Sequence, residues 1–180
     1  MLPAHEHKKK NAFWVEVAAK SSKIVALIDL CGHEKYLKTT LFGLVSMSPD
    51  YSMIVIGANA GLSKMTREHF GISLFLNIPM ILIITKIDLA PPEILENTRN
   101  EIKKLSKIPS INKTAIFIDS KSPQDEVDKW VKLVSTNTIL PIFMVSNKTG
   151  DGVAQLRTFL GKIPNRTSTN KFFDKKETPF

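Results

Sequence analysis

The sequence predicts an α/β fold, a three-layer sandwich with helices on both faces of a mainly parallel sheet. Short apolar runs alternate with segments of helical periodicity along the chain. The runs are continuously apolar, as in strands that are buried on both faces. Three of them end in polar motifs that contain glycine, lysine or aspartate. Because ligands of such sheets bind beyond the carboxyl ends of the strands, the fold also predicts where a site would lie.

The first third of the chain contains two predicted strands. Residues 23–30 and 51–58 are rich in β-branched and other apolar side chains. Between them, residues 34–45 predict a helix, because an acidic residue stands at its start and a glycine near its end. Residues 13–19 fit either an antiparallel neighbour of the first strand or a short helix.

The middle third predicts a helix, a strand and a second helix. Residues 65–77 carry apolar side chains at helical spacing. Residues 79–85 complete the longest apolar run, which is far shorter than the roughly 20 residues that cross a bilayer. Pro91 and Pro92 then open a helix that reaches residue 107, since proline is tolerated in a first helical turn.

The last third is less regular. It predicts a strand over residues 114–118, a helix over 126–134, a core strand over 140–145 and a final helix over 152–163. The sequence after Pro164 turns polar.

That change in composition predicts a domain over residues 1–165 and a linker over 166–180. The 180 residues suffice for one core, and 43% of them are hydrophobic, as in globular proteins. The net charge of +8 favours a polyanionic neighbour such as RNA, although the basic runs near both ends fit solvated tails better than a specific nucleic-acid contact. Cys31 is the only cysteine and no apolar leader opens the chain, so we expect a cytoplasmic protein with neither a membrane nor DNA as partner.

The most informative motifs are DLCGH from Asp29, TKID from Thr85 and SNKTG from Ser146. They follow three predicted strands at nearly equal intervals. The Asp29 carboxylate could hold Mg²⁺ through water. Gly32 lets the backbone approach a phosphate, and His33 could orient a water from a helix start. Taken alone, Asp29 also fits a simple cap, and His33 fits a structural histidine.

The second and third motifs fit a guanine ring. The Asp88 carboxylate can accept hydrogen bonds from guanine N1–H and the N2 amino group, a pair that adenine does not offer. Lys86 can lie along the base, and backbone N–H groups from Ser146 to Lys148 can reach guanine O6 while Gly150 lets the loop turn. Each motif alone fits an ordinary turn, but their joint occurrence at strand ends predicts a guanine-nucleotide site.

These residues resemble the third, fourth and fifth signature elements of translational GTPases of the elongation factor Tu class. DLCGHEKYLKTT from Asp29 and TKIDLAP from Thr85 are especially similar to the eukaryotic GTP-binding protein one and two family. The resemblance implies GTP or GDP with Mg²⁺ as cofactors and assigns Asp29 to the ion, Gly32 to the γ-phosphate and His33 to the hydrolytic water. It assigns guanine recognition to Thr85, Lys86 and Asp88, with the loop residues Ser146, Asn147 and Lys148.

The resemblance also implies a ribosome or RNA partner. At several positions, however, this sequence differs from the family pattern. Cys31 stands where most members have proline, and Thr85 replaces the commoner asparagine. No G-x-x-x-x-G-K-[ST] phosphate loop occurs in the sequence. We therefore expect a G domain without its phosphate-loop strand and first switch, followed by β-barrel domains that this chain does not contain.

In the family fold the phosphate-loop strand lies between the strand that ends at Asp29 and the strand that ends at Ala58. These two strands should therefore either pair directly or leave an apolar slot. We expect a marginally stable domain, at best weak base recognition and negligible GTP hydrolysis. The alternatives are a natural pseudo-GTPase that acts as a ribosome- or RNA-associated binding module, and another α/β enzyme such as an ATPase.

Overall fold

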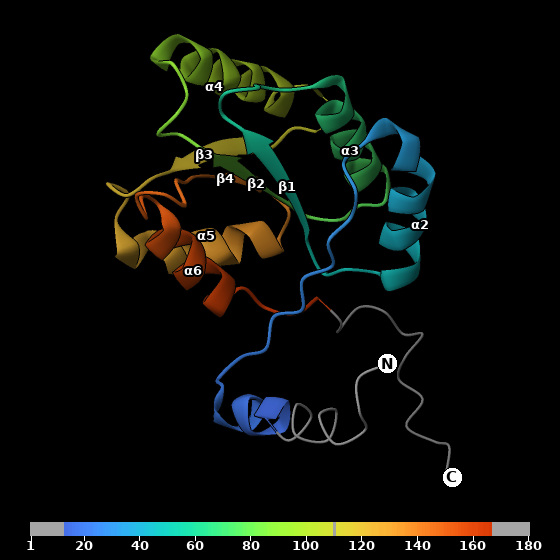
Figure 1. The fold of residues 1–180 in the computed structure, drawn as a ribbon, viewed down its shortest axis with the longest axis vertical. Helices are drawn as coiled ribbons and strands as arrows, with labels where there is room; N and C mark the ends of the chain where they lie inside the picture. The colour runs from blue at the N-terminus through green and yellow to red at the C-terminus, as the bar shows by residue number, and fades with distance from the viewer. Residues whose placement is uncertain (1–12, 110, 167–180) are drawn as a thin grey trace.

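The computed structural model describes residues 13–109 and 111–166 and confirms the three-layer α/β sandwich with a parallel sheet (Figure 1). Every strand pairs in parallel with its neighbours, in the order β1-β2-β4-β3. The strands are β1 (Ser52–Gly57), β2 (Met80–Thr85), β3 (Thr114–Ile118) and β4 (Ile139–Met144). All four strands lie where the sequence predicts them.

The helices also follow the predicted order. They are η1 (Glu34–Tyr36), α2 (Leu37–Met47), α3 (Lys64–Phe75), α4 (Pro92–Ser106), η2 (Gln124–Glu126), α5 (Val127–Ser135) and α6 (Val153–Lys162). Residues 13–20 are helical as well, so the helical alternative for this segment holds and the strand alternative is wrong. None of the helices within the described residues is both long and apolar enough to span a membrane.

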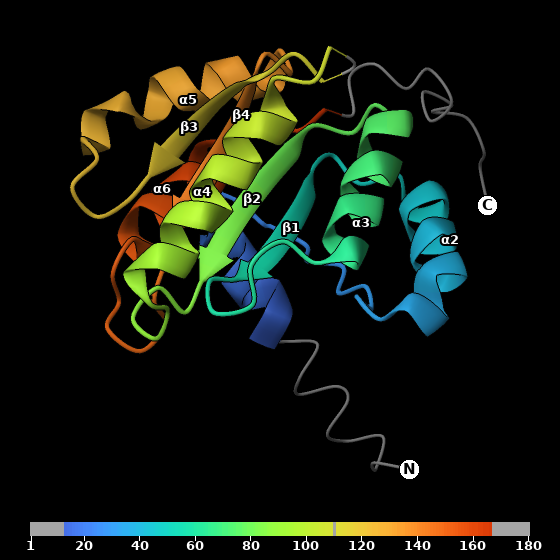
Figure 2. The same cartoon turned by 90° about the horizontal axis from the view of Figure 1, so that it is seen from above.

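Helices cover both faces of the sheet, with α3 and α4 on one side and α5 and α6 on the other (Figures 1 and 2). Side chains of β2 alternate between the two cores, because neighbouring residues of a strand point to opposite faces. Met80 and Leu82 pack with Ile102 of α4, whereas Ile81 packs with Trp130 of α5. Burial on both faces explains why the sequence of β2 is continuously apolar.

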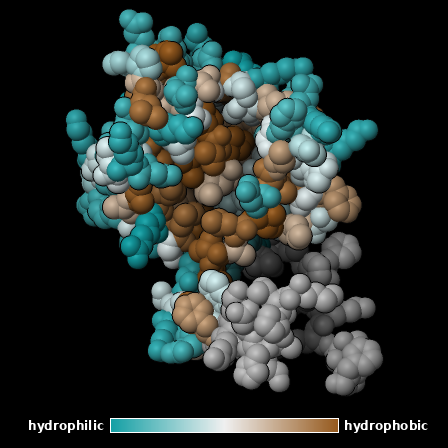
Figure 3. All heavy atoms as spheres, in the orientation of Figure 1, coloured by the Kyte–Doolittle hydropathy of each residue, from teal (hydrophilic) through white to brown (hydrophobic). Residues whose placement is uncertain are grey.

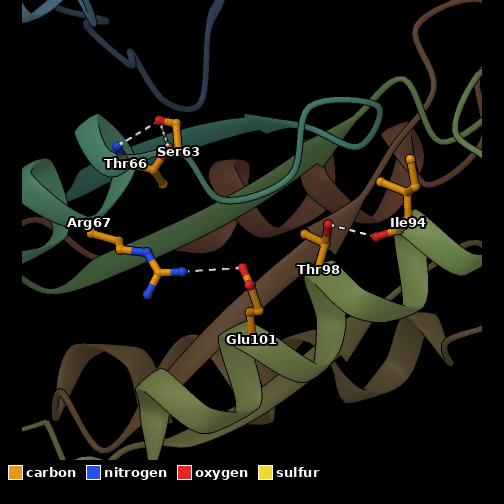
Figure 4. A network of polar contacts seen from close by, with 6 residues as sticks. All are labelled: Ser63, Thr66, Arg67, Ile94, Thr98 and Glu101. Atoms are coloured by element: carbon orange, nitrogen blue, oxygen red, sulfur yellow. Dashed lines mark hydrogen bonds and ion pairs between the residues drawn. The ribbon is translucent and has the colours of Figure 1, made fainter.

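A polar contact joins the two helices on one face. Arg67 of α3 points toward Glu101 of α4, with 3.4 Å between Nη2 and Oε2 (Figure 4). Ser63 caps α3 by accepting a hydrogen bond from the Thr66 amide, and Thr98 donates to the Ile94 carbonyl. Both charged groups are about half exposed, so we expect this ion pair to contribute less than about 1 kcal/mol.

Residues 23–30 do not form the predicted strand. They run beside β1 without regular secondary structure, and Ile24 and Leu27 are 69% and 72% exposed. A strand needs a neighbour for its backbone hydrogen bonds, and the sheet ends at β1, which does not pair with this segment. The predicted strand over residues 23–30 is wrong because its composition favours a strand, but no neighbouring strand forms backbone hydrogen bonds with it.

Of the two arrangements that we expected for this region, the structure shows the open slot. A cavity of about 790 Å³ lies between residues 26–30 and β1. Figure 3 shows apolar side chains gathered over the middle of this face of the molecule.

The last described residues are attached near the amino end of β1, opposite to the carboxyl ends of the strands. The Lys23 ammonium donates to the carbonyls of Leu160 and Ile163, and the Tyr51 hydroxyl donates to the Pro164 carbonyl over 2.9 Å. Burial is the main cause that raises the pKa of Tyr51 above its usual value. The predicted linker over 166–180 and the terminal basic runs lie, apart from Arg166, outside the described residues.

Candidate functional site

Two loops that are distant in sequence meet beyond the carboxyl ends of β2 and β4. Ser146 donates a hydrogen bond from Oγ to Asp88 Oδ1 over 2.7 Å, across 58 residues of sequence. The strands place them there, because β2 and β4 are neighbours in the sheet and the Val145 amide still donates to Ile84. A direct contact thereby fixes Asp88 of the second motif and Ser146 of the third motif relative to each other.

Ser146 is the organising residue of its loop. It is fully buried, and its Oγ also accepts a hydrogen bond from the Thr149 amide over 3.2 Å. Its carbonyl accepts from the Gly150 amide, and its own amide donates to the Asp151 carbonyl. Since each polar atom of Ser146 is paired, its hydroxyl proton has one favourable direction, which is toward Asp88.

Backbone conformation shapes both loops. Gly152 has a φ of 68°, and a Cβ at this position would lie 2.0 Å from the Met144 carbonyl oxygen. Lys86 adopts a φ of 60°, which is uncommon for a residue with a side chain. These positions allow the chain to turn sharply at the edge of the sheet, so that the side chains of Asp88 and Lys86 are exposed there.

Two backbone N–H groups in the loop that begins at Ser146 remain available to donate to a ligand. The N–H groups of Ser146, Thr149, Gly150 and Asp151 all donate within the loop. Within the described part of the chain, the amides of Asn147 and Lys148 donate to no protein acceptor. Two unused donors therefore directly follow Ser146, whose hydroxyl contacts the exposed carboxylate of Asp88, an arrangement that can pair with a ring carrying both acceptors and donors on its edge.

The first motif occupies a different loop. Asp29 and Gly32 line the open slot, and His33 caps η1, with Nδ1 accepting from the Lys35 amide over 3.1 Å. All three residues are exposed. No hydrogen bond or ion pair among the described residues connects them with Asp88 or Ser146, so the structure brings together the second and third motifs but not the first with either.

The Asp29 carboxylate suits a hard cation. It is exposed and accepts no hydrogen bond from the residues that the structure describes. Mg²⁺ is usually held by one or two carboxylates together with waters and substrate phosphates, so a single free carboxylate fits an ion that a nucleotide would share. Across residues 13–109 and 111–166, no group of three or more acidic, histidine or cysteine side chains gathers to form a complete protein cage.

Sequence reasoning missed one supporting residue. Thr40 is buried and donates from Oγ1 to the Cys31 carbonyl over 2.7 Å, which ties the first motif to α2. No local pattern marks this threonine, since its partner is nine residues away and lies outside the helix. The Thr149 amide contact is different, because a serine three residues before a threonine amide is a recognisable turn signal.

Ser146→Ala tests the contact between the loops. The variant should unfold with a free energy lower by about 1–2 kcal/mol, because Asp88 and the Thr149 amide both lose a partner. Urea denaturation followed by circular dichroism measures the change. Ser135→Ala is the matched control, since the hydroxyl of Ser135 is exposed and donates only to the Lys132 carbonyl. Equal midpoints for the two variants would show that the Ser146 contact contributes nothing.

The chain is similar in sequence to known proteins. The sequence model of the elongation factor Tu GTP binding domain matches residues 8–165. The chain is 40% identical to GTP-binding protein 1 of Xenopus laevis over 88% of its length, and 34% identical to human GTP-binding protein 2 over 87%. Among solved structures, elongation factor SelB from Methanococcus maripaludis in its apo form is 27% identical over 63% of this chain and 19% of its own, with a TM-score of 0.43.

The chain spans only part of these relatives. The matched region is 24% of the Xenopus protein and 26% of the human one.

Proposed function

Because the chain belongs to the elongation factor Tu GTP-binding domain family, we propose that it recognises guanine nucleotides through Asp88 and the loop that begins at Ser146. The observation that carries the proposal is the 2.7 Å hydrogen bond between Ser146 Oγ and Asp88 Oδ1. It joins the two motifs with base-reading chemistry at the edge of the sheet where ligands of α/β folds bind.

Each group has a distinct role in the proposed recognition. Asp88 accepts from guanine N1–H and the N2 amino group, and Ser146 holds the carboxylate in the plane of those donors. The unused amides of Asn147 and Lys148 donate to guanine O6. The aliphatic part of Lys86 covers one face of the ring, as long cationic side chains commonly cover apolar surface. The Thr85 hydroxyl, 3.4 Å from the Ile56 carbonyl, ties the end of β2 to β1.

The phosphate side of the proposed site uses the first motif. In this proposal the Gly32 amide would approach the terminal phosphate, Asp29 would hold Mg²⁺ through water, and His33 would orient a water with Nε2, since its cap uses Nδ1. A bound Mg²⁺ would supply charge neutralisation between the phosphates. This part rests on the residue types and on family membership, because no hydrogen bond or ion pair within the described residues joins the first motif to the base-side loops.

That separation leads us to propose that the 180-residue chain hydrolyses GTP negligibly. Phosphoryl transfer depends on positioning and on charge stabilisation, and loss of one fixed donor can cost about 2.7–4 kcal/mol. Phosphate release from GTP by the purified chain measures this directly. Turnover comparable with a complete GTPase would contradict the proposal without affecting base recognition.

Competition between nucleotides tests base recognition. A fluorescent GDP analogue is bound to the full chain and displaced with unlabelled GDP or ADP. We expect GDP to displace the probe at least about a hundredfold better, since a site that pairs with guanine leaves polar groups unsatisfied against adenine. Equal displacement by both nucleotides would show that the site does not read the base.

We further propose a ribosomal or other RNA-rich partner in the cytoplasm. Two observations support this proposal, namely the net charge of +8 and membership of the elongation factor Tu GTP binding domain family. Sedimentation of the chain with ribosomes should weaken steeply as salt rises, because contacts with phosphates release counterions. Binding that does not respond to salt would argue against a phosphate-based contact.

A further inference from the structure

The strand β3 forms an open edge of the sheet. Figure 2 shows it as the outermost strand, with α4 on one face and α5 on the other. The Thr114 amide donates to the Thr138 carbonyl, so Thr114 and Ile116 direct their backbone groups toward β4. Because neighbouring residues of a parallel strand direct these groups to opposite edges, the N–H and C=O groups of Ala115 and Phe117 face outward. No strand of the described chain pairs with them.

The chain itself closes both ends of this edge. Just before β3, the Lys113 amide donates to the Ser106 carbonyl. Just after it, the Asp119 amide donates to Ser122 Oγ over 3.0 Å. Only the middle of the strand is left unpaired, and the five residues of β3 span about 17 Å.

Two cationic side chains of α4 lie over one aromatic ring beside the edge. Phe117 packs on the α4 face, where Arg99 Cζ is 4.8 Å and Lys103 Nζ is 5.6 Å from its ring centroid. Arg99 Nε is buried without a hydrogen-bond partner, and the Glu96 carboxylate lies 3.8 Å from it. Within residues 13–109 and 111–166, Lys103 pairs with no carboxylate. An unsatisfied guanidinium N–H beside an unpaired ammonium favours an anionic group at this place.

From these observations we infer that the open edge of β3 binds an extended acidic segment of a partner protein. An extended segment presents N–H and C=O groups at every second residue, which is the spacing of Ala115 and Phe117. Its side chains alternate between the two faces of the sheet. Those on the α4 face are carboxylates that accept from Arg99 and Lys103, and those on the α5 face are apolar, because Ile116 packs there. Main-chain hydrogen bonds provide the affinity, and the two cations provide the selectivity.

Charge argues against this chain as its own occupant. Residues 1–12 and 167–180 each contain more lysines than acidic residues, so neither segment supplies an acidic strand. A second copy that paired edge to edge would bring its own Arg99 and Lys103 to the same face, where like charges repel. Cations beside a short edge strand are a common means of preventing such self-pairing.

The unpaired backbone groups argue against RNA at this edge. RNA supplies anionic phosphates, but it lacks the alternating N–H and C=O groups that a ladder needs. The edge also contains no residue of the base-reading loops. The inference therefore goes beyond nucleotide recognition.

A synthetic peptide probes the edge in the full 180-residue chain. It has about seven residues, enough to span β3, with glutamate alternating with valine and both ends blocked. We expect it to slow hydrogen exchange at the amides of Ala115 and Phe117 by at least about tenfold, because both amides become paired. The amides of Ile116 and Ile118, already paired with β4, serve as the internal reference.

Two altered peptides separate ladder formation from charge attraction. A peptide with lysine in place of glutamate can still form the ladder but meets Arg99 and Lys103 with like charge, so we expect no protection. A glutamate–valine peptide with methylated backbone nitrogens keeps the charge but cannot form the ladder. It should also leave the exchange of Ala115 and Phe117 unchanged.

The double variant Arg99→Gln/Lys103→Gln tests the charged contact on the protein. Its affinity for the dye-labelled peptide, measured by fluorescence anisotropy, should fall at least about tenfold because two ion pairs are lost. The control Lys104→Gln/Lys107→Gln removes the same charge from the same helix and its end. Its affinity should stay within about twofold at 0.15 M salt, where distant charges are screened. If the first variant fails to fold by circular dichroism, Lys103→Gln and the lysine peptide decide.

Four outcomes would overturn the inference. The first is unchanged exchange at both amides at the highest soluble peptide concentration, and the second is equal protection by either altered peptide. The third is protection of the same amides in a dimer of the chain alone, which would make a second copy the occupant. The fourth is equal protection by polyuridylate, which would make the edge a nucleic-acid contact. Since no guanine nucleotide enters these measurements, their failure is distinct from a failure of guanine recognition.

Discussion

Asp88→Asn is expected to weaken GDP binding by more than about a hundredfold and to let xanthosine diphosphate bind in its place. The carboxylate accepts two hydrogen bonds from guanine in the proposed site, and bonds to a charged group contribute about 1.5–3 kcal/mol each. A loss of about 3 kcal/mol corresponds to more than two powers of ten in affinity. The amide would instead donate to the second carbonyl of xanthine while still accepting from N1–H.

Displacement of a fluorescent nucleotide by GDP and by xanthosine diphosphate measures both changes. The fold should not change, because Asp88 is exposed and an amide can still accept the hydrogen bond from Ser146. Asp125→Asn provides the control, since this aspartate is exposed in η2. An Asp88→Asn variant that binds GDP as tightly as the parent chain would remove the basis of the proposed recognition.

Gly152→Ala is expected to destabilise the domain by about 2–5 kcal/mol. The left-handed backbone conformation costs an alanine about 1–2 kcal/mol, and overpacking of a buried site adds about 1–3 kcal/mol. The overpacking is severe here, because the new Cβ would lie 2.0 Å from the Met144 carbonyl oxygen, and backbone cannot move aside as a flexible side chain can. Urea denaturation followed by circular dichroism gives the change in the free energy of unfolding.

Gly161→Ala is the matched control for that substitution. Gly161 lies in α6, its added Cβ would meet no atom within 4 Å, and its φ is not positive. Alanine should therefore stabilise this position by about 0.5–1 kcal/mol through its higher helix propensity. The two variants make the same chemical change in one short segment and should shift the unfolding midpoint in opposite directions. Shifts in the same direction would show that the contact with Met144 relaxes at little cost.

Much of the fold could be predicted because its signals are local. The apolar run of β2 and the prolines at the start of α4 each identify an element without reference to the rest of the chain. The strand predicted over residues 114–118 has the same bounds as β3, although the segment is short. Residues 23–30 carry an equally strong local signal and still form no strand, since pairing depends on a neighbour that composition does not reveal.

The candidate site shows the same division. The sequence alone places Asp88 and Ser146 at strand ends and predicts base-reading chemistry for them, and the family resemblance assigns them the same role. The tertiary structure decided that Ser146 contacts Asp88 directly, that the amides of Asn147 and Lys148 stay unused, and that a slot separates β1 from the segment ending at Asp29. Periodicity and turn residues act over a few positions and can be read from the chain, whereas strand order and contacts between loops depend on which distant segments pack together.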